Sequence, residues 1–168
     1  VASLERAVAR TLGKRPAALA PSLAAVAAGR EAAAAFDTAF RLAPPPVTQD
    51  PRWLLTGNEA AAYGALRGGV RFVAAYPITP ATELLEWMAP ALTQVGGSLL
   101  QAEDELASIN MIIGASYGGV PSLTAAAGPG LALMTEAIGL AVSAEVPIVV
   151  VDVMRGGPST GIPAKSEQ

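Results

Sequence analysis

The sequence contains no cysteine and no histidine among its 168 residues. The chain therefore has no disulfide bond, and it supplies no cysteine ligand to an iron–sulfur cluster. Thiolate and imidazole are the usual zinc ligands, so a zinc site of the common kind is excluded as well. A catalytic Ser–His or Cys–His pair is excluded for the same reason.

Charged side chains are scarce: they make up 15% of the residues, whereas hydrophobic residues make up 52%. The net charge is −3 and no basic patch is visible, which argues against nucleic acid as a partner. The apolar composition predicts a chain that is buried on several faces, as a subunit is. The uncharged stretch 106–135 is interrupted by Gly, Pro and polar residues, which favours a buried α/β core over a membrane span.

Three parts with different composition follow one another along the chain. Residues 1–38 are rich in alanine and favour helix, so we expect them to be the helical end of a preceding domain. Four prolines between positions 40 and 52 make that stretch stiff and extended, which predicts a linker over 39–56. An α/β domain is expected over 57–168. The missing initiator Met and the ending IPAKSEQ indicate a fragment whose last domain is truncated at its C-terminus.

Helical and strand patterns alternate after Trp53, which predicts a parallel sheet with helices on both faces. The run VPIVVVDV is apolar without alternation, as expected of a central parallel strand. Helices are expected over about 57–66, 81–94, 104–117 and from the 128–130 turn to about 143; strands are expected over 71–76, 97–101, 121–126 and 146–153.

Ligands of open parallel sheets bind beyond the carboxyl ends of the strands. The segments that follow the four strands contain a hydroxyl group, carboxylates, a Gly-rich turn and a guanidinium group. This combination suits a small anionic substrate beside a group that needs a proton partner. The segments are 76–80, 102–105, 128–130 and 154–161.

Two of these side chains have both a structural and a functional interpretation. Thr79 precedes a predicted helix, where it can serve as the N-cap, bind a carboxylate, or do both. Arg155 is the only basic residue between Arg71 and Lys165 and ends an apolar strand. It is either a clamp for a substrate carboxylate or the partner of Asp152 or Glu145 in an ion pair.

The acidic run Glu103–Asp104–Glu105 is typical of a solvated helix start. An apolar stretch follows at once, so Glu105 can instead face inward, where a carboxylate in an apolar pocket can share a proton with a ring nitrogen. The Gly128–Pro129–Gly130 turn is no dinucleotide fingerprint, because Leu133 stands at the position of the third Gly.

Four motifs together resemble the alpha subunit of 2-oxoacid:ferredoxin oxidoreductases, and most closely the 2-oxoglutarate type in which a gamma domain precedes the alpha domain. The motifs are YPITP, AEDE, GPG and RGGPSTG, in that order within residues 57–168. The resemblance implies the pyrimidine-binding domain of a thiamine-diphosphate fold, and it makes residues 1–38 gamma-like. It also implies a cytoplasmic enzyme that oxidatively decarboxylates a 2-oxoacid to acyl-CoA and CO₂ and reduces ferredoxin.

The same resemblance assigns roles to individual residues. Glu105 matches the glutamate that hydrogen-bonds the aminopyrimidine ring of thiamine diphosphate and favours its imino form. Thr79 and Arg155 match residues that bind the substrate carboxylate, whereas Glu103 and Asp104 keep a structural role. The further positions expected to contact the cofactor are Pro77, Ile78, Gly128 and Pro129.

What the chain lacks implies a partner. It has no Gly-Asp-Gly metal motif for the diphosphate and Mg²⁺, and no cysteine for an iron–sulfur cluster. Both are expected in a beta-type subunit of an (alpha-beta)2 assembly that uses coenzyme A. Two alternatives stay open: a non-oxidative thiamine-diphosphate 2-oxoacid decarboxylase, and a non-catalytic assembly subunit.

Overall fold

A computed structural model describes residues 2–36, 43 and 52–163 of the chain. The chain divides into two compact units, residues 1–51 and 52–168. Most of the linker predicted over 39–56 lies outside the described residues. No helix in the described part is long and apolar enough to cross a membrane.

The first unit holds two helices, α1 (Ala2–Leu12) and α2 (Pro16–Ala34). The alanine-rich composition predicted helix here, and the structure confirms it. Pro16 occupies the first turn of α2, where its missing N–H group costs no hydrogen bond. Neither helix has a buried residue, so these two helices form no core of their own.

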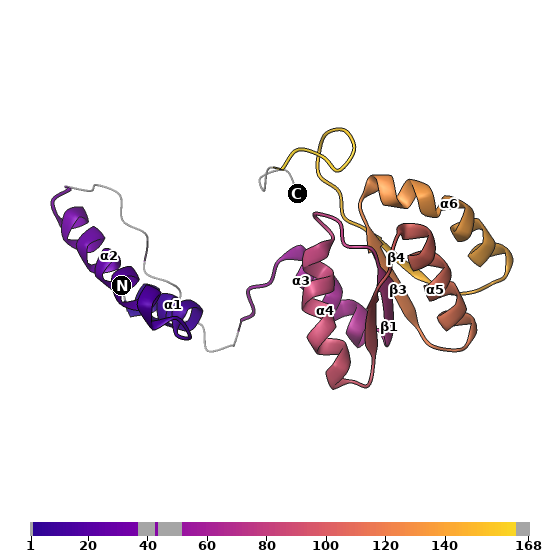
Figure 1. The fold of residues 1–168 in the computed structure, drawn as a ribbon, viewed down its shortest axis with the longest axis horizontal. Helices are drawn as coiled ribbons and strands as arrows, with labels where there is room; N and C mark the ends of the chain where they lie inside the picture. The colour runs from indigo at the N-terminus through magenta and orange to yellow at the C-terminus, as the bar shows by residue number, and fades with distance from the viewer. Residues whose placement is uncertain (1, 37–42, 44–51, 164–168) are drawn as a thin grey trace. The chain divides into compact units, whose positions relative to one another are not determined.

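The second unit alternates helices and strands (Figure 1). A capping box begins its first helix: the Thr56 side chain accepts a hydrogen bond from the Glu59 backbone, and the Glu59 carboxylate accepts one from the Thr56 backbone. The elements are α3 (Gly57–Arg67), β1 (Phe72–Ala75), α4 (Thr82–Gln94), β2 (Ser98–Gln101), α5 (Glu105–Tyr117), β3 (Ser122–Ala126), α6 (Gly128–Ser143) and β4 (Val149–Asp152).

The four strands form one sheet in the order β2-β1-β3-β4, and all the pairings are parallel. Ala75 of β1 is level with Gln101 of β2, and Ala126 of β3 is level with Asp152 of β4, so the carboxyl ends of the strands share one edge. Helices cover both faces of the sheet, α3 and α4 on one and α5 and α6 on the other (Figure 1). The predicted fold class is confirmed.

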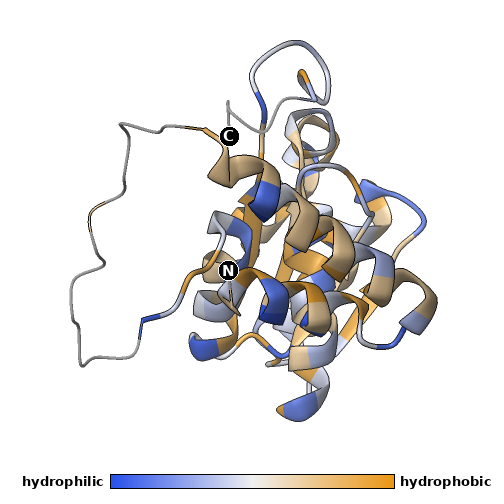
Figure 2. Ribbon diagram, turned by 90° about the vertical axis from the view of Figure 1, so that its left-hand side faces the viewer, coloured by the Kyte–Doolittle hydropathy of each residue, from blue (hydrophilic) through white to orange (hydrophobic). Residues whose placement is uncertain are grey.

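Alternating side chains divide the core into two layers. Val73 and Ala75 of β1 pack with α3 and α4, whereas Ala74 packs with α5 and α6. The middle strands β1 and β3 are buried along almost their whole length, and hydrophobic ribbon lies in the interior of Figure 2, whereas the edge strand β2 is mostly exposed. Fully buried Leu84 and Ile112 represent the two helical layers.

Strand β4 corrects one prediction. It pairs only with β3 among the described residues, so it is an edge strand of this sheet and not a central one. Its apolar sequence has another cause: Val151 contacts one core layer and Val150 the other. The apolar composition of β4 thus indicates that both faces of the strand are covered, but it does not indicate whether the strand has a neighbour on one side or on both.

Truncation of a buried side chain on α5 is expected to destabilise the chain strongly. Ile112 is completely buried, and Ile112→Ala should lower the free energy of unfolding by about 2–5 kcal/mol, because it leaves a cavity. Met111→Ala is the matched control, since Met111 is exposed on the same helix and its loss should cost less than about 1 kcal/mol. Urea unfolding followed by circular dichroism measures both, and equal losses would contradict the described core.

Candidate functional site

The sheet has a switch point between β1 and β3. The chain leaves β1 toward α4 on one face, and it leaves β3 toward α6 on the other face. The two connections diverge at the carboxyl ends of neighbouring strands, where open parallel sheets bind their ligands. Residues 76–81 connect β1 to α4, and Ala127 alone connects β3 to α6, whose first turn is residues 128–130; the segments after β2 and β4 begin at the same edge (Figure 1).

Glu105 is the buried acid of this edge. It is the first residue of α5 and only 9% exposed, whereas Glu103 and Asp104 are exposed. Asp104 is the N-cap of α5, because its side chain accepts a 2.7 Å hydrogen bond from the backbone N–H of Ala107. Asp104 therefore has the structural role that was predicted for it, and Glu105 faces inward.

The Glu105 carboxylate lies against the first turn of α6. Its Oε1 atom and its Cγ atom are both 2.9 Å from the place that a Cβ atom on Gly130 would occupy. No described residue donates a hydrogen bond to this carboxylate, and the N-cap of α6, Ala127, offers no capping side chain. The Glu105 oxygens are not among the buried atoms that lack a partner, which in the described residues are Thr124 Oγ1 and Asp152 Oδ1, so the carboxylate can be reached from this edge and can accept a hydrogen bond from a ligand.

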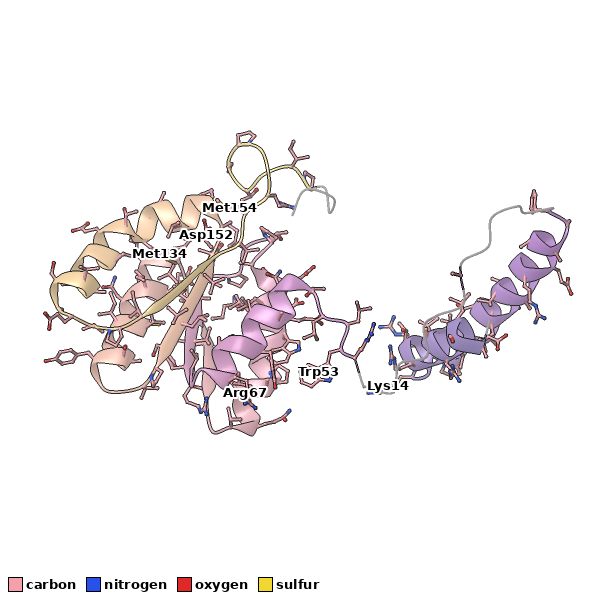
Figure 3. All side chains as sticks on the ribbon, turned by 180° about the vertical axis from the view of Figure 1, so that it is seen from behind. Lys14, Trp53, Arg67, Met134, Asp152 and Met154 are labelled. Carbon is pink, nitrogen blue, oxygen red and sulfur yellow. The ribbon has the colours of Figure 1, made fainter. Side chains whose placement is uncertain are left out.

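Residues 128–130, predicted as a turn before the helix, are already the first turn of α6, and their backbone also approaches the segment after β4. A Cβ atom on Gly128 would be 3.3 Å from the Met154 sulfur, and Met154 lies just beyond Asp152 at the end of β4 (Figure 3). The turn therefore lies between side chains from α5 and from the β4 segment. Neither contact is visible in local sequence, because both join segments more than 20 residues apart.

The turn after β1 corrects the prediction for Thr79 as a helix cap. Helix α4 begins at Thr82 with Ala81 as its N-cap, and no side chain caps it. The backbone N–H of Thr82 bonds the Ile78 carbonyl oxygen at 3.0 Å, so a turn precedes the helix and leaves Thr79 exposed within that turn. Pro77 and Ile78 are half-buried.

Asn58 holds this turn in place, and sequence reasoning missed it. Its side-chain amide donates a 3.1 Å hydrogen bond to the Pro80 carbonyl oxygen, which ties the start of α3 to the end of the YPITP motif. The two residues are 22 positions apart, so no local pattern could have revealed the contact.

Arg155 follows β4 and is half-buried. Its Nε atom donates a 3.0 Å hydrogen bond to the Thr160 carbonyl oxygen. Gly161, with a positive φ of 83°, passes so close that a Cβ atom there would be 2.6 Å from the Arg155 Cβ. Within the described residues Arg155 makes no ion pair, so the alternative of a salt bridge with Asp152 or Glu145 is wrong.

Asp152 is a second unpartnered acid near the same edge. It alternates with Val151 and Val153 and therefore lies on the α5–α6 face of β4, level with Ala126. Its Oδ1 atom is buried and has no hydrogen-bond partner among the described residues. Desolvation by burial raises the pKa of the Asp152 carboxyl above its ordinary value.

A pH-dependent stability effect is expected from Asp152. Because its folded pKa is raised, the folded state holds the proton more tightly than the unfolded state, and stability falls as the pH rises through the folded pKa. Asp152→Asn carries no charge at any pH, so it should melt at a higher temperature than the wild type near pH 7. Melting temperatures from pH 4 to 8 should show the gap closing toward pH 4, and a constant gap would contradict the assignment.

The structure thus brings some of the predicted site residues together and places others only at the same edge. The Glu105 side chain packs beside Gly130, and the Met154 side chain packs beside Gly128. Thr79 and Arg155 follow β1 and β4, the two strands that flank β3. The edge offers the carboxylate of Glu105, the guanidinium group of Arg155 and the hydroxyl group of Thr79, which can bind a cofactor that donates a hydrogen bond and a substrate that carries negative charge.

The fold and this edge define a class: a parallel α/β domain that binds a cofactor at its switch point. Residues 63–168 match the sequence model of the family described as pyruvate flavodoxin/ferredoxin oxidoreductase, thiamine diphosphate-binding. The match spans more than half of the chain, and the chain belongs to this family.

Individual relatives agree with the family. The 2-oxoglutarate synthase subunit KorA of Methanocaldococcus jannaschii is 54% identical over 114 residues, which are 68% of this chain and 31% of that protein. The 2-oxoglutarate oxidoreductase subunit KorA of Mycobacterium tuberculosis is 39% identical over 143 residues, 82% of this chain and 22% of that protein. The chain therefore spans less than a third of the length of either relative.

A solved structure has the same fold. The 2-oxoglutarate:ferredoxin oxidoreductase of Magnetococcus marinus, with 2-oxoglutarate, coenzyme A and succinyl-CoA bound, superimposes with a TM-score of 0.80 at 47% identity. The comparison covers 95% of this chain and 28% of that one.

Proposed function

We propose that this chain is part of the alpha subunit of a thiamine-diphosphate-dependent 2-oxoacid:ferredoxin oxidoreductase, with 2-oxoglutarate as the 2-oxoacid. The observation that carries the proposal is Glu105, whose side chain packs beside Gly130 at the switch point of the sheet and whose carboxylate accepts no hydrogen bond from a described residue. The names of the relatives point to the same reaction and to 2-oxoglutarate.

The residues at the edge fit the aminopyrimidine ring of thiamine diphosphate. Glu105 would accept a hydrogen bond from a protonated ring nitrogen, since no described residue donates one to its carboxylate. Pro77 and Ile78 in the connection after β1, and Gly128 and Pro129 in the first turn of α6, lie at the switch point, where the backbone can approach a flat ring closely. When bound, thiamine diphosphate supplies a nucleophilic carbon that attacks the carbonyl group of the 2-oxoacid.

Arg155 and Thr79 would hold the substrate. Among the described residues the guanidinium group uses only its Nε atom, which donates to the Thr160 carbonyl oxygen, and its two terminal nitrogens can bind a carboxylate in a bidentate manner. The exposed Thr79 hydroxyl group can donate one more hydrogen bond to the same carboxylate.

A beta-type subunit would complete the site. Large hydrophobic side chains are exposed around the segments of this edge, as is typical of a surface that another subunit covers. They are Tyr76, Leu106, Leu133, Met154 and Ile162. The partner would bring Mg²⁺ and the iron–sulfur cluster in an (alpha-beta)2 assembly, with coenzyme A and ferredoxin as the remaining reactants.

The first unit would belong to a preceding gamma-like domain, with residues 39–56 as the connector and 57–168 as the pyrimidine-binding domain. The similarity to the Magnetococcus marinus structure supports this assignment, because it covers 95% of the chain and so extends into the two N-terminal helices.

The proposal is tested by turnover of the assembled enzyme. We expect the full alpha subunit with its beta-type partner to reduce a low-potential acceptor when given thiamine diphosphate, coenzyme A and 2-oxoglutarate, and to do so more slowly with pyruvate and branched 2-oxoacids. Release of an aldehyde without coenzyme A or acceptor would show a non-oxidative decarboxylase. Binding of the partner without any turnover would show an assembly subunit.

A further inference from the structure

Gly130, the third residue of α6, has no side chain at the point where Glu105 packs against that helix. We propose that Gly130 is a positioning residue, whose missing side chain sets the direction of the Glu105 carboxylate. The inference rests on the proposed function, since the direction of Glu105 matters for catalysis only if it binds the cofactor ring.

Space, and not backbone conformation, requires glycine at this position. Gly130 is not among the glycines with positive φ, so its backbone would accept an alanine. A Cβ atom there would nevertheless lie 2.9 Å from both Cγ and Oε1 of Glu105 and 3.1 Å from the Ala126 Cβ. Such separations are well inside carbon–carbon contact distance, so a neighbour must move.

Glu105 is the neighbour that would move. The Ala126 Cβ belongs to the fully buried strand β3 and cannot rotate away, whereas the Glu105 side chain has several rotatable bonds. Its carboxylate would therefore turn from the switch point, and the hydrogen bond to a cofactor ring would lengthen or bend. A displacement of about 1 Å in a catalytic group can reduce the rate about 10²-fold.

The test compares two glycines of the same helix in the assembled enzyme. Gly130→Ala should slow the exchange of the C2 proton of bound thiamine diphosphate for deuterium by about 10²-fold, with little change in the KM for the 2-oxoacid. Gly139→Ala is the matched control, because nothing lies within 4 Å of a Cβ atom there, and it should exchange at the wild-type rate.

A second measurement separates positioning from a general disturbance of the helix. Truncation of Glu105 removes the two shortest contacts and leaves the 3.1 Å approach to the Ala126 Cβ, so Gly130→Ala should lower the melting temperature of Glu105→Ala clearly less than that of the wild type. A crystal structure of Gly130→Ala should show a displaced carboxylate at Glu105.

The outcomes are distinct. An active wild type with an equally active Gly130→Ala variant, or an unmoved Glu105 in its crystal structure, overturns the inference alone. The same loss of melting temperature in both backgrounds also overturns it. A wild-type enzyme without thiamine-dependent turnover overturns the proposed function, and the inference with it.

Discussion

Glu105→Gln in the assembled enzyme is expected to slow the removal of the C2 proton of thiamine diphosphate by about 10²- to 10⁴-fold. Glutamine keeps the size of the side chain but cannot accept a proton or hold a negative charge beside the ring nitrogen. Exchange of the C2 proton for deuterium, quenched in acid and followed by NMR, measures this step directly. The grounds for so large an effect are the burial of the Glu105 side chain and the absence of a described residue that donates a hydrogen bond to its carboxylate.

Glu103→Gln is the control for this experiment. Glu103 is exposed two residues earlier in the same acidic run, so the substitution removes the same charge from the same segment. We expect its exchange rate to match the wild type. A Glu105→Gln enzyme of near wild-type rate would remove the catalytic role of Glu105, and equal losses in both variants would point to a general charge effect.

Arg155→Ala is expected to raise the KM for the 2-oxoacid by about 10- to 100-fold, because hydrogen bonds to charged groups contribute about 1.5–3 kcal/mol. The KM for coenzyme A should change far less, since the guanidinium group is assigned to the substrate carboxylate. Arg155→Lys should recover only part of the loss, because an ammonium group cannot form two parallel hydrogen bonds with a carboxylate.

Arg67→Ala is the control for Arg155→Ala, because it removes a guanidinium group away from the proposed site. Arg67 lies in the last turn of α3, which leads to the amino end of β1, and it is exposed (Figure 3). Initial rates at varied concentrations of each substrate measure both variants, and Arg67→Ala should leave both KM values unchanged. Equal shifts for the 2-oxoacid and coenzyme A in Arg155→Ala would contradict the assignment of the carboxylate to Arg155.

Local patterns predicted most of the secondary structure because the signals for it lie within a few residues. Gly118 and Gly119 follow α5 where the sequence indicated its end, and apolar runs between glycine-rich stretches predicted the strands. The alternation of helix and strand then implied a parallel sheet, and its carboxyl edge predicted where the chemistry would lie.

Local sequence patterns did not predict the contacts between segments that are distant in the sequence. Thr79 was predicted as a helix cap but lies in a turn before α4, and β4 was predicted as a central strand but lies at the edge of the sheet. The orientation of Glu105 was open to two interpretations on the residues alone, and the choice came from the resemblance to a family.

The sequence by itself determined the alternation of elements, the class of fold and the chemical groups at the carboxyl edge, because each depends on local spacing or on the family motifs. Only the tertiary structure decided that Glu105 packs beside Gly130, that Asn58 holds Pro80 and that Asp152 has no partner among the described residues. Each of these depends on the approach of segments from different helices and strands, which the packing of the whole sheet determines and no short stretch of sequence encodes.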